Sequence, residues 1–184
     1  MAQTTLTPIS LSELESWLFE AANILRGPID AADFKTYIFP LLFFKRICDV
    51  FDEEYQIALA EADGDVEEAS YRENFRFYIP ENCHWRDVRE RTENVGSAIT
   101  HAMQCIERAN PRTLSQIFGD VQWGNKERLP DRLLNNLIEH FSEKTLSNAN
   151  VEPDMAGRAY EFLIKKFADE SNKAAGEFYT PRNV

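Results

Sequence analysis

Apolar residues recur every three or four positions through most of this chain, a spacing that predicts helices with one buried face. The first such segment has clear boundaries. Ser10 and Glu13 form the pattern of a capping box at its start, and Gly27 with Pro28 predicts its end. We therefore expect a first helix whose buried positions are Leu11, Leu14, Leu18, Ala21, Ala22 and Leu25.

The second helical segment is the most hydrophobic part of the chain. Asp30 can cap its start, and the stretch LLFFKRICDVF, residues 41–51, is apolar on nearly every side, which is typical of a central helix packed against several neighbours. Pro40 lacks an amide proton and clashes with the preceding turn, so we expect a kink or a break just before it. Gly64 is the expected stop of this segment.

Further helices and several shorter features follow. Helices are expected around residues 95–106, before Asn110 and Pro111, around 133–141, and around 153–167, where Pro153 suits the first turn. The shorter features are an exposed loop at 63–73, a strand or an extended segment pinned to the bundle at 75–79, a loop with a helical turn at 81–94, a short turn of helix at 114–118, and a loop after 167. The predicted fold is all-α, an irregular helical bundle of about five or six helices with a possible short extended segment near residues 75–79.

Composition narrows the class of protein. The 31 acidic residues exceed the 20 basic ones and give a net charge of −11, which argues against a broad nucleic-acid surface, although a local basic patch is compatible with it. Three scattered cysteines form no disulfide framework, and the first ten residues lack the pattern of a signal peptide, so we expect a cytoplasmic protein. The longest apolar run, residues 37–44, is far shorter than the roughly 20 residues of a membrane span.

Few residues suggest a self-contained active site. Cys83 and His84 are adjacent and point in opposite directions on an extended chain, and no second pair at ligand spacing accompanies them, so we predict no metal site. His101 and His140 lie near apolar helix faces without a nucleophile in the pattern of a triad, and we interpret them as surface or rim histidines. The chain has no phosphate-binding glycine motif.

Charge runs leave two interpretations open. The densest basic stretch is RDVRER, Arg86 to Arg91, in which Asp87 and Glu90 favour internal ion pairs, with contact to nucleic acid or an acidic partner as the alternative. The acidic run from Asp52 to Glu73 is typical of a solvated face.

Three segments together resemble a known family. These are the final strip GEFYTPRNV, the opening LFEAANILRGPIDAADFKTYIFPLLFFKRICDVFDEEY, and the aromatic FRFYIPENCHW. They are similar, in this order, to the modification subunit of type I restriction-modification systems, a DNA adenine N6-methyltransferase. The resemblance extends from about Leu14 to Val184. In that family a helical N-terminal domain precedes the catalytic domain, and a strip like GEFYTPR joins them.

The resemblance implies that the final strip borders S-adenosylmethionine. The residues so assigned are Glu177, Phe178, Tyr179, Thr180, Pro181 and Arg182. A threonine hydroxyl and amide suit the methionine carboxylate of the cofactor, an aromatic ring offers a flat face, and proline suits the start of a following helix. A plain linker is the alternative. We expect a helical domain at residues 1–170 and a linker carrying this first strip of the cofactor site at 171–184.

The resemblance also implies a reaction and partners. The family transfers a methyl group from S-adenosylmethionine to N6 of a flipped adenine and needs a glycine-rich loop and an N-P-P-[FY] motif, which this chain lacks, since Asn110-Pro111 is followed by Arg112. We therefore expect this piece alone to be inactive and to bind little cofactor. Implied partners are the specificity subunit, the restriction subunit, a second modification subunit and duplex DNA, with no membrane. The alternative function is a free-standing helical protein–protein interaction module without a methyl-transfer role.

Overall fold

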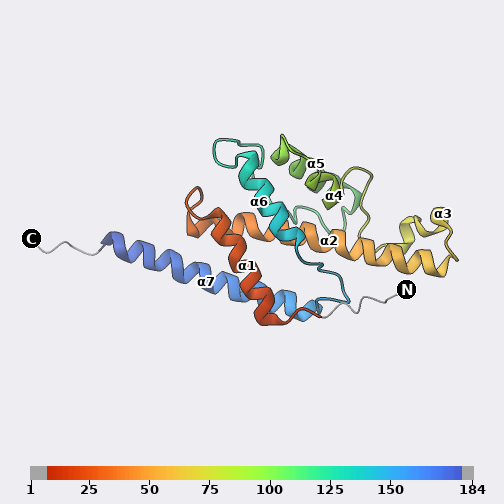
Figure 1. Ribbon diagram of the computed structural model, residues 1–184, viewed down its shortest axis with the longest axis horizontal. Helices are drawn as coiled ribbons and strands as arrows, with labels where there is room; N and C mark the ends of the chain where they lie inside the picture. Colours follow the sequence, from red (N-terminus) through yellow and green to blue (C-terminus); the bar gives the residue numbers. More distant parts are fainter. Residues whose placement is uncertain (1–7, 180–184) are drawn as a thin grey trace, which may run out of the picture.

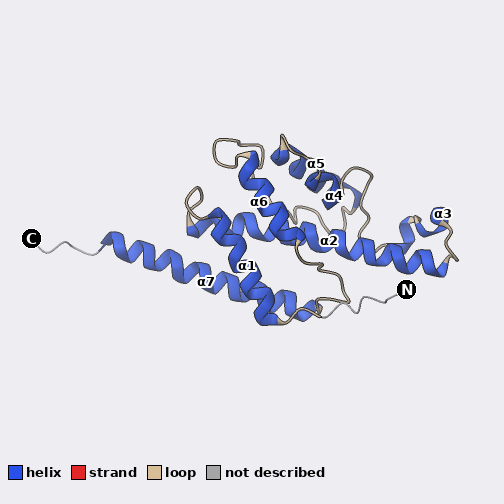
Figure 2. Ribbon diagram, in the orientation of Figure 1, coloured by secondary structure: helices blue, strands red, loops and turns tan. Residues whose placement is uncertain are grey.

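The computed structural model describes residues 8–179, and these residues form helices joined by turns and loops, without a strand (Figure 2). The elements are α1 (Leu11–Leu25), η1 (Ala31–Asp33), α2 (Phe34–Glu61), α3 (Val66–Ala69), η2 (Arg72–Asn74), α4 (Trp85–Arg89), α5 (Val95–Ala109), α6 (Asp131–Ser142) and α7 (Pro153–Tyr179). The predicted all-α class and helical bundle are confirmed. Among the described helices, none is both long and apolar enough to cross a membrane.

The arrangement is organised around α2 (Figure 1). Helices α4, α5 and α6 lie on one side of α2 and α7 lies on the other, while α1 contacts α2, α6 and α7. The C-terminal half of α7 projects past the loop that joins α1 to α2 (Figure 1). The N-terminal part of α7 is therefore attached to the bundle, and its C-terminal half extends beyond it.

Three boundaries of α1 and α2 follow the sequence signals, whereas Asp30, the predicted cap of the second helix, makes no side-chain cap bond and α2 begins at Phe34, after η1. The Ser10 hydroxyl accepts a hydrogen bond of 3.2 Å from the Glu13 amide, which confirms the predicted N-cap. Gly27 follows the helix with a positive φ of 105°, which a glycine adopts without strain. At the end of α2, Gly64 donates to the Leu59 carbonyl at 2.8 Å and Asp63 takes the left-handed conformation, so the chain leaves the helix through a Schellman turn.

Of the kink or break predicted just before Pro40, the break does not occur, and the kink stays a prediction. Helix α2 continues through Pro40 from Phe34 to Glu61. Proline removes only one backbone donor, and Pro40 is buried together with Phe39 and Leu41. Packing on these side chains holds the helix continuous across the missing hydrogen bond.

Three shorter predictions need correction, and a fourth is decided between its two alternatives. The 63–73 loop contains α3, because the Asp65 carboxylate caps the amides of Glu67 and Glu68. Of the two alternatives for residues 75–79, the strand does not form, and the segment is instead pinned to the bundle, since the Asn110 side chain bonds both the amide and the carbonyl of Tyr78, at 2.9 and 2.8 Å. Residues 114–118 form turns and no helix. The loop expected after residue 167 is helical, and α7 continues to Tyr179 through residues that favour helices.

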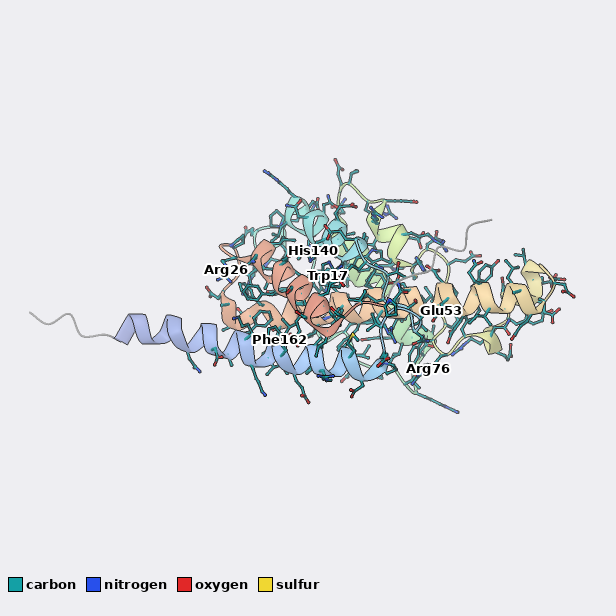
Figure 3. The ribbon with its side chains drawn as sticks, turned by 60° about the horizontal axis from the view of Figure 1, so that its bottom comes forward. Trp17, Arg26, Glu53, Arg76, His140 and Phe162 are labelled. Atoms are coloured by element: carbon teal, nitrogen blue, oxygen red, sulfur yellow. The ribbon has the colours of Figure 1, made fainter. Side chains whose placement is uncertain are left out.

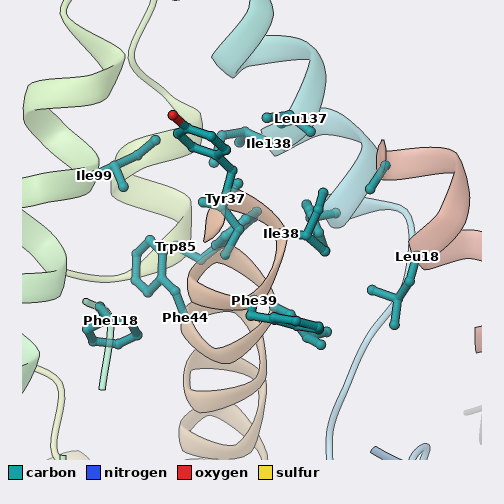
Figure 4. Packing of buried hydrophobic residues seen from close by; sticks show 14 of the residues in the cluster. Leu18, Tyr37, Ile38, Phe39, Phe44, Trp85, Ile99, Phe118, Leu137 and Ile138 are labelled. Atoms are coloured by element: carbon teal, nitrogen blue, oxygen red, sulfur yellow. The ribbon is translucent and has the colours of Figure 1, made fainter. Parts of the chain in front are cut away.

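The core lies against both sides of α2, as predicted for residues 41–51. Phe44 is fully buried, and its ring centroid lies 5.2 Å from that of Trp85 in α4 and 6.3 Å from that of Phe118 (Figure 4). Gly96 of α5 allows a close approach on the same side, because a Cβ there would lie 1.9 Å from the Trp123 carbonyl oxygen. The predicted central helix is confirmed.

One polar stripe on α2 binds the connection between α6 and α7. The stripe consists of Lys45, Arg46, Asp49 and Glu53. The Arg46 guanidinium donates to the carbonyls of residues 146, 147 and 151 at 2.5, 2.8 and 3.2 Å. The Asp49 carboxylate accepts from the Leu146 amide at 2.7 Å and pairs with Lys45. Burial raises the pKa of the Asp49 carboxyl, and the Lys45 charge opposes this rise.

Candidate functional site

The strip assigned to the cofactor begins at the end of α7. Glu177, Phe178 and Tyr179 lie in its last turn, whereas Thr180, Pro181 and Arg182 lie outside the described residues. Their contact with S-adenosylmethionine stays a prediction. The division into residues 1–170 and 171–184 also stays a prediction, and α7 crosses residue 170 without interruption.

Aromatic contacts hold the first half of α7 on the bundle. The Phe167 ring meets that of Phe34 at 5.6 Å, and the Tyr160 ring lies 4.2 Å from that of Phe39. Leu163 is fully buried between these two contacts along the helix. The anchored face of α7 therefore contains Tyr160, Leu163 and Phe167, and these contacts fix the direction in which α7 leads toward the strip.

An apolar recess opens where α1, α2 and the start of α7 meet. It has a volume of about 300 Å³, and its walls include Leu14, Leu42, Phe43 and Tyr160. Tyr160 and Ile164, one turn apart on α7, each keep 37% of their surface exposed. Ile164 thus extends this apolar surface along the outside of α7.

The basic stretch from Arg86 to Arg91 forms part of α4 and the turn that follows. Arg89 makes a two-pronged ion pair with Glu139 of α6, at 2.8 and 2.9 Å. Its hydrogen bond raises the pKa of the guanidinium and lowers that of the Glu139 carboxyl. Asp87 instead caps α4 by accepting from the His84 amide at 2.9 Å. Ion pairs within the stretch were predicted, but the ion pair that Arg89 makes joins α4 to α6.

The histidines occupy different environments. His101 is exposed, as predicted. The interpretation of His140 as a rim residue is wrong, because it is buried, its Nε2 lies 2.8 Å from the Trp17 carbonyl oxygen, and its ring stacks on that of Trp17 (Figure 3). His84 is also buried; its Nδ1 accepts from the Arg86 amide and its Nε2 lies 3.0 Å from Asp52 Oδ1, without the angle of a hydrogen bond. His84 and His140 therefore contribute to the packing and hydrogen bonding of the fold.

The structure brings together three ligand-type side chains that the sequence analysis did not combine. The thiols of Cys83 and Cys105 and the imidazole of His101 have donor atoms within 4.8 Å of one another. His101 and Cys105 are four residues apart on α5, a spacing that places both on one helix face, whereas Cys83 comes from the turn before α4. Only the His101–Cys105 spacing was visible in the sequence. We call this group the Cys–His–Cys cluster.

Comparisons with known proteins agree with one another and match methylase subunits of type I restriction enzymes. The model of the HsdM N-terminal domain matches residues 14–141, and that of the N-6 DNA Methylase matches residues 151–184. The type I restriction enzyme MjaIX methylase subunit of Methanocaldococcus jannaschii is 24% identical, over 94% of this chain and 34% of its own length. The MpnII methylase subunit of Mycoplasma pneumoniae is 23% identical, over 93% of this chain and 38% of its own length.

A solved structure shares the fold. The crystal structure of the type I restriction-modification system methyltransferase subunit from Streptococcus thermophilus matches with a TM-score of 0.65 and 19% identity, over 88% of this chain and 39% of that chain. The chain thus spans between a third and two fifths of the length of the proteins that it matches. None of these matches supports an unrelated free-standing interaction module.

Proposed function

The chain belongs to the HsdM N-terminal domain family, and from this premise we propose that it is the N-terminal part of a type I DNA adenine N6-methyltransferase subunit. The observation that carries the proposal is the order of the two family matches, in which the helical domain is followed directly by the methylase match from residue 151 onward. The whole protein would transfer a methyl group from S-adenosylmethionine to N6 of an adenine flipped out of duplex DNA.

The residues of the final strip are proposed to border the cofactor. The anchoring of α7 on Phe34 and Phe39 supports this, because a helix held on the bundle gives the strip a defined starting point. Its residues supply one wall of a pocket, and a cofactor pocket must enclose most of its ligand. The chain contains neither a glycine-rich loop nor an N-P-P-[FY] motif, so we expect residues 1–184 alone to bind little S-adenosylmethionine and to transfer no methyl group.

Calorimetry on the full-length subunit tests the strip. Tyr179→Ala and Thr180→Ala should each weaken S-adenosylmethionine binding about tenfold, the equivalent of roughly 1.4 kcal/mol. Tyr71→Ala is the matched control, because Tyr71 is an exposed tyrosine that precedes η2. Unchanged affinity in both strip variants would remove these residues from the site, and tight binding to residues 1–184 would refute the argument from an incomplete pocket.

Methyl transfer itself needs a separate measurement. The full-length subunit, supplied with its specificity subunit and duplex DNA, should incorporate a labelled methyl group at adenine N6. Label on cytosine, or no label in the presence of both partners, would contradict the proposed reaction.

The domain's own role is proposed to be assembly in the cytoplasm with the specificity subunit, the restriction subunit, a second modification subunit and the bound duplex. The net charge of −11 favours protein partners over broad contact with DNA. The apolar recess and the exposed face of α7 support a protein contact at this place, because exposed apolar surface of this kind is typical of interaction sites.

A pair of isoleucines tests the assembly surface. Ile164→Glu on α7 should reduce co-purification with the specificity subunit, since it puts a charge into the proposed contact. Ile57→Glu on α2 is the control, because Ile57 is exposed as well and lies outside the recess. Equal recovery of the partner with both variants would remove α7 from the interface.

A further inference from the structure

We propose that the Cys–His–Cys cluster is a site for a thiophilic divalent cation, with zinc as the fitting ion. Two thiolates and one imidazole are the donors that zinc prefers, and no part of this proposal depends on methyl transfer. The ion would link the turn before α4 to α5, two elements that pack against each other in the described structure.

The distances fit a tetrahedral ion. With zinc–sulfur and zinc–nitrogen bonds of about 2.3 and 2.0 Å, a sulfur and a nitrogen donor lie about 3.5 Å apart, and two sulfur donors about 3.8 Å apart. The Cys105 sulfur lies 3.7 Å from His101 Nε2, and all three donor atoms are within 4.8 Å of one another. Shifts of a few tenths of an ångström to about one ångström would complete the geometry.

The cluster combines a buried donor with an accessible one. Cys83 is 2% exposed, Cys105 is partly buried and His101 is exposed, so an ion can enter from solvent on the His101 side. A cavity of about 560 Å³, which His101 lines together with Asp87 and Ser97, opens beside it and leaves room for water as the fourth ligand.

The surrounding charge also suits the ion. One zinc ion, two thiolates and a neutral imidazole sum to zero, so the loaded site adds no net charge to the interior. Arg108 donates toward the Cys105 sulfur from 3.7 Å, the kind of outer contact that orients and stabilises a ligating thiolate.

Cobalt titration of the full-length protein tests the site. Co²⁺ bound by two thiolates in a tetrahedral site gives sulfur-to-metal charge-transfer absorption and intense visible bands, and added Zn²⁺ should abolish both at one equivalent. Each of His101→Gln, Cys105→Ser and Cys83→Ser should weaken Zn²⁺ affinity about tenfold or more, since even outer contacts of metal ligands carry effects of this size. Cys48→Ser is the thiol control, because the Cys48 sulfur lies elsewhere, 3.3 Å from the Trp85 amide.

The outcomes separate clearly. Loss of the cobalt spectrum in the three cluster variants, with retention in Cys48→Ser, supports the site. If Cys83→Ser fails to fold, the exposed His101→Gln and the partly buried Cys105→Ser decide alone. An unchanged spectrum in these two variants, octahedral cobalt only, or a Cys83–Cys105 disulfide that forms in the presence of excess Zn²⁺ would overturn the proposal.

Discussion

Truncating Phe44 to alanine removes a ring that no solvent reaches and that packs between α4 and the 111–120 turns. Its side chain is 0% exposed, and the rings of Trp85 and Phe118 lie 5.2 and 6.3 Å away. Because Trp85 and Phe118 belong to separate segments, neither can fill the space without moving its own contacts. The expected loss in the free energy of unfolding is therefore about 3–5 kcal/mol, the range for a buried phenylalanine.

The neighbouring Phe43 provides the control. Phe43 is partly buried and lines the apolar recess, so Phe43→Ala should cost only about 1–2 kcal/mol. Urea unfolding followed by circular dichroism gives both values, and the melting temperature of Phe44→Ala should fall by roughly 6–20 °C. Equal losses for the two variants, or a loss below about 1 kcal/mol for Phe44→Ala, would refute the central position of α2.

Three further measurements follow from other contacts. Arg46→Met should cost about 3 kcal/mol in urea unfolding and should expose residues 144–151 to protease, because buried carbonyls lose a charged donor; Lys35→Met is an exposed control. The pKa of Asp131 is lowered, because the amides of Val95 and Asn94 outweigh its partial burial. Its stabilisation is therefore present above the unfolded pKa of about 3.9 and lost as pH falls through the lower folded value, so the stability difference between parent and Asp131→Asn should vanish in acid. The isolated chain should bind duplex DNA weakly and lose binding with salt, and submicromolar, salt-resistant binding by fluorescence anisotropy would contradict this and assign a contact to residues 86–91.

The sequence predicted the long helices well because their signals are local. The Ser10 cap and the apolar spacing around Val95 and Ile99 depend on neighbours within one or two turns, and Val95 and Ile99 are fully buried as expected. Predictions failed where a distant group decided the outcome. At 75–79 the strand alternative fails because Asn110, 32 residues away from Tyr78, takes the hydrogen bonds that a second strand would have made, which leaves the alternative of a segment pinned to the bundle.

The same distinction applies to the candidate sites. His140 is buried against a distant partner, because its Nε2 donates a hydrogen bond to the Trp17 carbonyl, 123 residues away, and no local pattern contains that information. Cys83 meets His101 and Cys105 only through the packing of α4 against α5. The assignment of the final strip to the cofactor came from resemblance to a family, because helical periodicity carries no information about the role of a segment at the end of a helix.

The polar stripe of α2 has a consequence for synthesis on the ribosome. Arg46 finds its carbonyl partners about 100 residues later in the chain, at Leu146 and beyond. At translation rates of about 5–20 residues per second, these partners are synthesised roughly 5–20 s after α2. During this interval the guanidinium of Arg46 and the Lys45–Asp49 pair must stay hydrated. The N-terminal neighbours of α2 therefore cannot bury this face of the helix on their own. The nascent bundle is thus kept open along this stripe until the start of α7 emerges.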